Sequence, residues 1–217
     1  MNAVQMRLEK IMECAWVAEK RGYHHGELRK ALITATDDIL RESGIEGFSL
    51  RDAARRAGVS PGAPAHHFGS ASGLLTEVAI LGYEELARYL DEAVDDGTPA
   101  GRMRALAAAY VTFALDHPGR FRLMFRKDLV NRTNPVYEET SKRALWPFAE
   151  AIARVNGTTL EAMLEARNLA PIFAAWSTAH GIAHLALEDK MHFALQGNYD
   201  EDFRKRLLPE ILKAQWA

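Results

Sequence analysis

Four side chains that could bind a metal recur every four residues near the end of the chain: His180, His184, Glu188 and His192. On a continuous helix this spacing places adjacent pairs on neighbouring turns, where two imidazoles can chelate zinc. One helix seldom supplies all the ligands of a zinc site, and no His-Glu-x-x-His motif occurs. We therefore expect no metal and interpret His180 as a buried hydrogen-bonding residue; a metal-dependent protein stays as the alternative.

Other catalytic patterns are missing from the sequence. It has no phosphate-binding P-loop, no dinucleotide-binding glycine motif and no nucleophile elbow. The serines and carboxylates have no partner at a spacing that indicates catalysis. We expect neither an enzyme nor a bound cofactor.

A second chemistry-bearing stretch runs from Phe48 to Phe68 and has the pattern of two short helices joined by a tight turn. Ser49 followed by Asp52 resembles a capping box, which predicts a helix from Leu50 to Ala57. Gly58 is the residue type that ends a helix in the left-handed conformation. Ser60 and Pro61 then predict the start of the second helix, which gives a helix-turn-helix.

The side chains of this stretch could contact DNA. The formal net charge is −2, so attraction to DNA must come from a local patch, and Arg51, Arg55 and Arg56 lie close in sequence to two histidines. A helix in the major groove reads bases with its first residues, where His66 is the one strong polar reader. A plain helical corner without chemistry is the alternative. The expected DNA contacts are Arg51, Arg55, Ser60, Gly62, Ala63, His66 and His67.

This region resembles the DNA-binding domain of the tetracycline-repressor (TetR) family of bacterial transcription regulators. The resemblance covers Tyr23 to Leu75 and is carried by AARRAGVSPGAPAHHF and the Leu74-Leu75 pair. Trp176-Ser-Thr-Ala-His-Gly181 is similar to the Trp-x-x-x-His-Gly (WHG) signature of one regulatory domain type. Ala65 and Ala71 depart from the family, which usually has Tyr and Lys there, and the resemblance implies weaker phosphate contacts as a result.

The elements that must position these residues are all predicted to be helices. Apolar spacing predicts helices over residues 26–43 and from Leu74 to Val94, and the second half has no convincing strand. The predicted fold is all-α: a three-helix helix-turn-helix domain (23–75) joined by a long helix to a helical ligand-binding and dimerisation domain (76–217). Residues 1–22 form an extension, either a contact arm or the product of an upstream start codon.

Aromatic and methionine side chains recur at helical spacing in the second half. Such a set forms a core or lines a largely apolar effector cavity, and one sequence does not separate the two. The expected pocket residues are Tyr110, Phe113, Met124, Phe125, Trp146, Phe173, Trp176 and His180.

One long helix is expected from Leu160 to Leu187, apolar on two opposite faces and therefore buried on both. We expect its aromatic face to point into its own domain. The small-residue face is predicted to pack on a second chain, together with a last helix from Asp200 to Lys213. The expected dimer contacts are Ala175, Thr178, Ala179, Ile182 and Ala186.

Composition fits a cytoplasmic protein. Cys14 is the only cysteine, the N-terminus is too charged for a signal peptide, and no apolar run reaches the ~20 residues that span a bilayer. The resemblance implies a homodimeric, ligand-responsive repressor that binds a palindromic DNA operator and an unknown, largely apolar effector. The alternative is a helical small-molecule- or metal-binding protein whose helix-turn-helix has lost its affinity for DNA.

Overall fold

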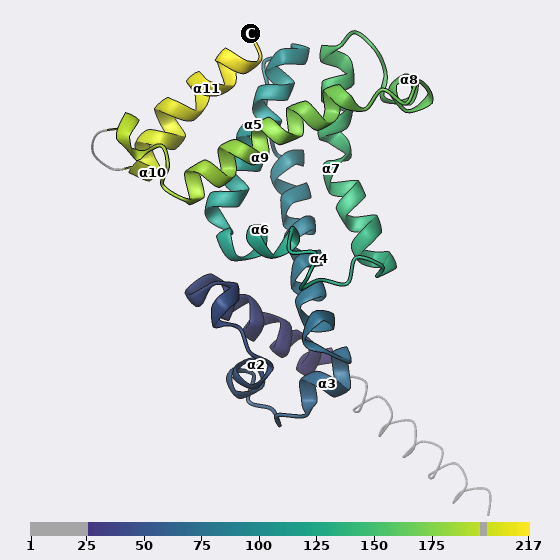
Figure 1. Cartoon of the computed structure of the whole chain (residues 1–217), viewed down its shortest axis with the longest axis vertical. Helices are drawn as coiled ribbons and strands as arrows, with labels where there is room; N and C mark the ends of the chain where they lie inside the picture. The colour runs from purple at the N-terminus through teal and green to yellow at the C-terminus, as the bar shows by residue number, and fades with distance from the viewer. Residues whose placement is uncertain (1–25, 196–198) are drawn as a thin grey trace, which may run out of the picture. The chain divides into compact units, whose positions relative to one another are not determined.

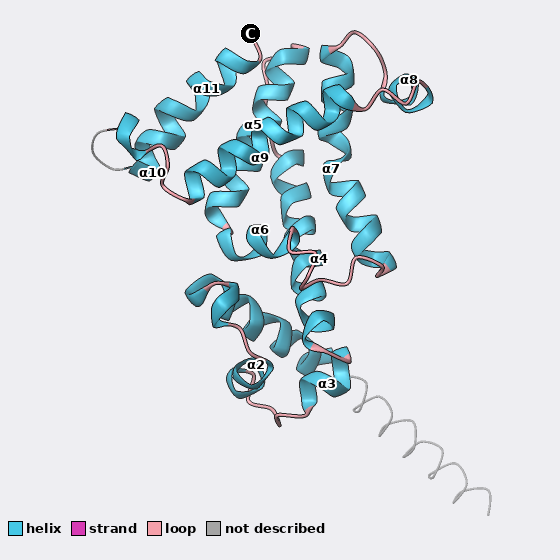
Figure 2. Cartoon of the chain, viewed as in Figure 1, coloured by secondary structure: helices cyan, strands magenta, loops and turns pink. Residues whose placement is uncertain are grey.

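The computed structural model of the chain describes residues 26–195 and 199–217. These residues form helices and loops without a strand, so the all-α prediction is confirmed for them (Figure 2). The predicted extension, residues 1–22, lies outside the described residues. The backbone divides into two compact units between Leu75 and Thr76. No described helix is long and apolar enough to cross a membrane.

The N-terminal unit is built from short helices around a small core. A helix over residues 26–43 is followed by η1 (Ile45–Gly47), α2 (Leu50–Arg56) and α3 (Ala63–Phe68). Gly44 ends the first helix with a φ of 68°, which favours glycine. The core contains buried Leu32, Ile39, Ala53 and Leu74, with seven half-buried apolar side chains packed around them.

The second helix of the helix-turn-helix starts later than predicted. Pro61 and Gly62 lie in the turn, and α3 begins at Ala63 with Pro64 in its first turn. Pro64 has no N–H to donate, which costs nothing at this position because the first N–H groups of a helix have no partner within it. The prediction of a helix starting at Pro61 is therefore wrong by two residues.

The long helix α4 (Ala71–Asp91) also differs from its predicted bounds. It begins three residues before Leu74, because the Ser70 hydroxyl accepts the Gly73 N–H at 3.1 Å and caps the helix. It ends at Asp91, and Val94 lies in the following loop with 90% of its surface exposed.

The C-terminal unit packs around α5 (Pro99–Asp116), which contacts α6 (Pro118–Met124), α7 (Pro135–Val155), α9 (Ala170–Leu187) and α11 (Leu208–Gln215) (Figure 1). Eight residues of α5 are buried, among them Tyr110 and Phe113. A helix buried on this scale is held by the apolar surface that its neighbours remove from water. The helices α6, α7, α9 and α11 are therefore arranged around α5.

The single helix predicted from Leu160 to Leu187 is two helices. The first, α8 (Leu160–Glu165), ends where Arg167 takes a φ of 52° and the Asn168 N–H bonds to the Met163 carbonyl at 3.0 Å. Pro171 then lies in the first turn of α9. At the end of the chain, α10 (Tyr199–Asp202) and α11 are joined by a π-helical segment, Phe203–Leu207, which precedes Pro209.

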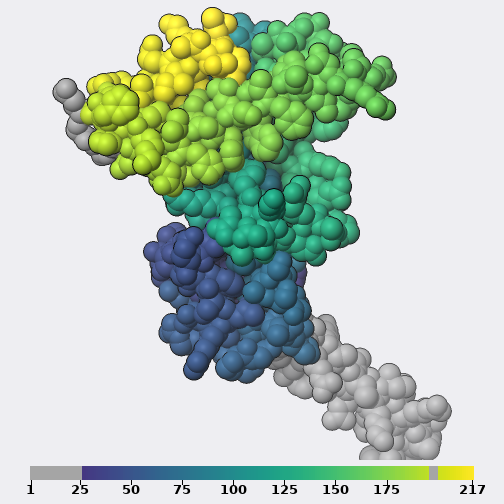
Figure 3. Space-filling model, viewed as in Figure 1, coloured from purple at the N-terminus to yellow at the C-terminus, as the bar shows by residue number. Residues whose placement is uncertain are grey.

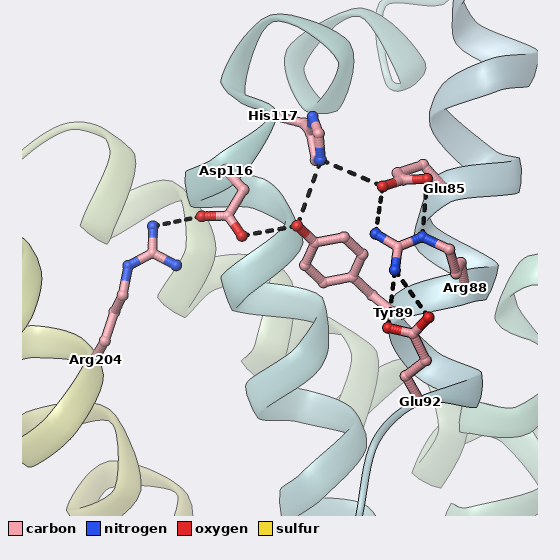
Figure 4. Close-up of polar contacts among 7 residues, drawn as sticks. All are labelled: Glu85, Arg88, Tyr89, Glu92, Asp116, His117 and Arg204. Carbon is pink, nitrogen blue, oxygen red and sulfur yellow. Dashed lines mark hydrogen bonds and ion pairs between the residues drawn. The ribbon is translucent and has the colours of Figure 1, made fainter.

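A polar network joins α4, the end of α5 and the C-terminal helices (Figure 4). The Tyr89 hydroxyl donates to Asp116 at 2.8 Å, and the other Asp116 oxygen pairs with Arg204 at 2.9 Å. Burial, followed by the hydrogen bond to Asp116, raises the pKa of Tyr89 to about 12. Tyr89 therefore stays protonated at neutral pH and acts as the hydrogen-bond donor between α4 and α5.

The cap of α2 gives a first prediction. The Ser49 hydroxyl accepts the Asp52 N–H at 3.1 Å and donates to the Asp52 carboxylate at 2.9 Å. We expect Ser49→Ala to lower the free energy of unfolding by about 1 kcal/mol, measured by urea denaturation. Ser49→Thr keeps the hydroxyl and is the matched control; equal stability of the Ala variant and the unmodified protein would contradict the capping role.

Candidate nucleic-acid interface and effector cavity

The turn between α2 and α3 follows from two backbone hydrogen bonds. The Val59 N–H bonds to the Ala54 carbonyl at 3.0 Å, and the Gly58 N–H bonds to the Arg55 carbonyl at 3.2 Å. Together with the Gly58 φ of 69°, these bonds form the Schellman motif that ends a helix. The Val59 side chain packs on the core of the unit, so the turn is held at both ends.

Asp52, in the first turn of α2, also holds the side chain of Arg55, one of the expected DNA contacts. Arg55 forms an ion pair with Asp52 at 3.1 Å, and both side chains are largely exposed. The Ser49 hydroxyl and then Arg55 hold the pKa of Asp52 below its usual value, so Asp52 is ionised at neutral pH. The ionised carboxylate therefore orients the Arg55 guanidinium at the surface.

Most of the predicted DNA contacts are at the surface of the unit. Arg51, Arg55, Ser60, Gly62 and His66 are exposed, whereas Ala63 and His67 are half-buried. Arg56, the third arginine of the patch, pairs with Glu42 at 2.7 Å. Ala65 is exposed and presents only a methyl group. Five of the seven predicted DNA-contact residues are therefore accessible to a large ligand.

Two features that position α3 were not found from the sequence. A Cβ at Gly73 would lie 2.0 Å from the Phe68 carbonyl oxygen, so only glycine allows the start of α4 to pass this close to the end of α3. The Arg29 guanidinium lies 4.8 Å from the centre of the Phe68 ring, a cation–π contact from the first helix. In the sequence, the Ser70-x-x-Gly73 spacing could have indicated the close approach of α4 to α3 at Gly73.

Two cavities of the C-terminal unit are lined by residues that we expected to contact an effector. We call the first, of about 340 Å³, the cationic cavity; Lys127, Arg132 and Lys142 are its charged residues, and its other lining residues are Tyr83, Met124, Phe125, Tyr137, Ser141, Leu145 and Trp176. The second, of about 290 Å³, is the apolar cavity, lined by Lys142, Leu145, Trp146, Phe148, Ala149, Ile172, Phe173 and Trp176. Both volumes are at the lower end of small-molecule sites. Lys142, Leu145 and Trp176 line both cavities.

Trp176, which lines both cavities, takes part in a series of hydrogen bonds with Tyr110 and His180. The Trp176 Nε1–H lies 3.3 Å from the Tyr110 hydroxyl oxygen, which is 2.8 Å from Nδ1 of His180. Because an indole N–H can only donate, the Tyr110 oxygen accepts from it and gives its own proton to His180. Burial and then the nearby His184 lower the pKa of His180 to about 4. His180 is therefore neutral at pH 7.

The expected effector residues occupy three places. Met124, Phe125 and Trp176 line the cationic cavity, and Trp146, Phe173 and Trp176 line the apolar cavity. Tyr110 and His180 are linked to Trp176 by hydrogen bonds and line neither cavity. Phe113 is fully buried against Tyr89, His117 and Phe121, so it belongs to the core. Sequence spacing alone did not separate wall from core, and it missed the three cations.

The residues of the predicted dimer face lie mostly inside the C-terminal unit. Ala175, Ala179, Ile182 and Ala186 are buried within the single chain, and only Thr178 of the five is half-exposed. The small-residue face of α9 thus packs inside its own unit, where α9 contacts α5. The opposite face is exposed: it carries Phe173, Ala174, Ser177 and Leu185. A helix apolar all round gives no sequence signal for which face points inward.

The row of potential metal ligands is interrupted. α9 ends at Leu187, and Asp189 takes a φ of 56°, which turns the chain before His192 is reached. Glu188 pairs with Arg122 at 2.8 Å, and Nδ1 of His192 lies 2.8 Å from the Asp189 carbonyl. Among the described residues, no group of three or more metal-binding side chains is close enough to hold an ion.

Contact between α4 and α6 sets one wall of the cationic cavity. A Cβ at Gly82 would lie 2.7 Å from Sδ of Met124, so α4 passes directly behind this lining residue. The hydroxyls of Tyr83 and Tyr137 both donate to the Met124 carbonyl, at 3.3 and 2.8 Å. Burial of Tyr83 raises its pKa well above the usual range, so its proton stays in this bond.

Two family models match the chain. The model for bacterial regulatory proteins of the tetR family matches residues 32–78, and the model for the Tetracyclin repressor-like C-terminal domain matches residues 103–208. The chain belongs to the TetR family. The first match covers the whole helix-turn-helix, and the second covers Trp176 to Gly181 and the walls of both cavities except Tyr83. Members of this family are DNA-binding transcriptional regulators, and the TetR resemblance seen in the sequence is confirmed.

The chain matches its named relatives over only part of their length. YobS of Bacillus subtilis, an HTH-type transcriptional regulator, is 26% identical over 52% of this chain and 60% of YobS. BetI of Burkholderia thailandensis, also an HTH-type transcriptional regulator, is 38% identical over 38% of the chain and 44% of BetI. The chain therefore spans less than two thirds of both relatives.

Solved structures match over most of the chain. A protein of unknown function from Rhodococcus sp. has a TM-score of 0.68 at 28% identity, over 89% of this chain and 96% of that one. PfmR of Thermus thermophilus, a TetR family transcriptional regulator, has a TM-score of 0.53 at 18% identity, over 85% and 93% of the two chains. The second likeness shows the shared fold alone.

The pKa of His180 predicts a pH dependence of stability. An unfolded histidine binds its proton near pH 6.5, and folded His180 binds it only near pH 4, so the unfolded state holds more protons between these values. The free energy of unfolding should fall as the pH drops from about 6.5 toward 4. We expect His180→Gln to make this fall shallower, measured by urea denaturation at pH 7, 6 and 5. His192→Gln, which removes an exposed histidine, is the control; identical slopes for the His180 variant and the unmodified protein would refute the assignment.

Proposed function

We propose that the chain is a ligand-responsive repressor that acts as a homodimer on a palindromic DNA operator. The observation that carries the proposal is the helix-turn-helix itself: its apolar side chains pack on one core, and Arg51, Arg55, Ser60 and His66 remain exposed. A regulator of this type works where the DNA is, which in bacteria is the cytoplasm.

Few side chains of α3 could read bases. The helix has six residues, of which Ala63 and Ala65 offer methyl groups and His66 offers a ring that can donate and accept. Arg51 and Arg55, at the surface of α2, fit contacts with phosphates. With so little direct readout, we infer that operator choice depends strongly on half-site spacing and DNA shape.

The exposed face of α9 is the surface that we assign to the dimer. It carries the small residues Ala174, Ser177 and Gly181, flanked by exposed Leu185. A Cβ at Gly181 would meet no atom of the chain within 4 Å, so the helix surface there is open. In the space-filling view α9 lies at the surface of the C-terminal unit (Figure 3). Small residues allow the backbones of two helices to approach closely.

The two cavities support a response to a small molecule. An effector can shift the protein between DNA-bound and released forms only by its difference in affinity for them. Trp176 lines both cavities and is hydrogen-bonded to Tyr110 of the central helix, so a ligand that displaces its ring also disturbs α5. We infer that this contact transmits the response.

Operator binding tests the proposed interface. The operator is first selected from random DNA and from the DNA upstream of the gene, and affinity is then measured by fluorescence anisotropy across a salt series. We expect Arg55→Ala and His66→Ala to weaken binding by about 1–3 kcal/mol each. Arg51→Ala should weaken binding to all sequences alike and reduce the salt dependence.

The matched control is Arg143→Ala, an exposed arginine of α7 that lines neither cavity. It should leave operator affinity unchanged. Unchanged affinity in both the Arg55 and the His66 variants would exclude this assignment of the interface. Equally weak binding to every DNA would instead support a protein that has lost its DNA function, with Ala65 as one cause.

The dimer surface is tested by Gly181→Trp. A Cβ at this position meets no atom of the chain within 4 Å, whereas the bulky ring would block close approach of a second α9, so we expect a shift from dimer to monomer in sedimentation velocity. Ala162→Arg, at an exposed position of α8, is the control and should stay dimeric. A Gly181→Trp variant that remains fully dimeric would place the interface elsewhere.

A further inference from the structure

The charges around the cationic cavity indicate which chemical class of effector it takes. We propose that the cavity binds a small amphipathic organic anion, a carboxylate with an apolar body. This inference rests on the proposed ligand response and goes beyond the sequence-based expectation of a largely apolar effector.

Three cations and no carboxylate line the cationic cavity. Lys127 and Arg132 are exposed, and neither forms an ion pair with an acidic residue in the described parts of the chain. Lys142 pairs with Glu138, one turn earlier on α7 and outside the lining. Charges of one sign around a cavity attract the opposite charge. A guanidinium can also hold a carboxylate through two parallel hydrogen bonds.

The neutral donors of this cavity are already in use. Tyr83 and Tyr137 donate to the Met124 carbonyl, Ser141 donates to the Glu138 carbonyl at 3.0 Å, and Trp176 donates to Tyr110. A ligand acceptor would have to break one of these bonds to receive a hydrogen bond from a neutral side chain of the lining. The cationic side chains are the donors that remain, and they favour an ionised acceptor.

The apolar cavity gives the place for the body of the ligand. It shares Lys142, Leu145 and Trp176 with the cationic cavity, so a molecule whose head lies at Arg132 can extend past Trp176. Two large rings of the apolar cavity, Trp146 and Phe173, are 46% and 56% exposed. An alkyl or aromatic body would cover them and remove their apolar surface from water.

Octanoate, 1-octanol and octylamine form a probe series with one body and three head charges. Binding to the full-length dimer is followed by isothermal titration calorimetry and by tryptophan fluorescence. We expect octanoate to bind at least tenfold more tightly than octanol, octylamine to bind most weakly, and added salt to weaken octanoate alone. Equal affinities for octanoate and octanol, or no binding of any probe, would overturn the proposal.

Variants locate the head group. The double variant Lys127→Met with Arg132→Met should lower octanoate affinity at least tenfold and leave octanol binding unchanged. Arg143→Met, the control on α7, should change neither. An equal loss in the control, or an unaltered octanoate affinity in the double variant, would overturn the assignment. Circular dichroism confirms that each variant is folded.

Operator release, measured with the same probes, separates this inference from the proposed function. Octanoate that binds selectively and releases DNA supports both. Release by octanol as readily as by octanoate keeps the ligand-responsive repressor and overturns the anion selectivity. Selective octanoate binding without any effect on DNA supports the anion site and counts against the proposed response.

Discussion

The buried hydroxyl of Tyr110 constrains the packing of α9 on α5 in the C-terminal unit. Tyr110 is fully buried on the central helix, where an unpaired hydroxyl costs about 1–3 kcal/mol. Trp176 and His180, four residues apart on α9, both reach this one oxygen. The Trp-x-x-x-His spacing is thereby explained: it puts two side chains on one helix face to satisfy a single hydroxyl, and it fixes the indole ring that forms the wall common to both cavities.

The N-terminal unit is stabilised in a different way, because two of its helices are short. Its helices α2 and α3 have seven and six residues, well below the roughly 12–15 at which isolated helices become stable. They are held by end contacts instead: the Ser49 cap, the Schellman turn at Gly58, and the close approach of Gly73 to Phe68. Exposed ion pairs such as Arg55–Asp52 contribute little to stability, so the framework does not depend on them.

How much could be predicted from sequence depended on the range of the interactions. The Ser49 cap and the left-handed Gly58 are local features, and both were found from residue types. The break at Arg167 was missed because a non-glycine residue at positive φ has no composition signal, although Pro171 marked the restart. The inward face of α9 and the separation of Phe113 from the cavity walls depend on packing between helices distant in sequence, which periodicity does not report.

Gly82 controls the cationic cavity without lining it. Even one methyl group at this position of α4 would collide with the flexible end of Met124, a lining residue of the cavity, so the thioether would have to move. The space beside Met124 in the cavity therefore depends on a residue of α4 that is not itself a lining residue. Related chains that differ in side-chain size at this point can diverge in the length of molecule they accept while keeping every wall residue the same.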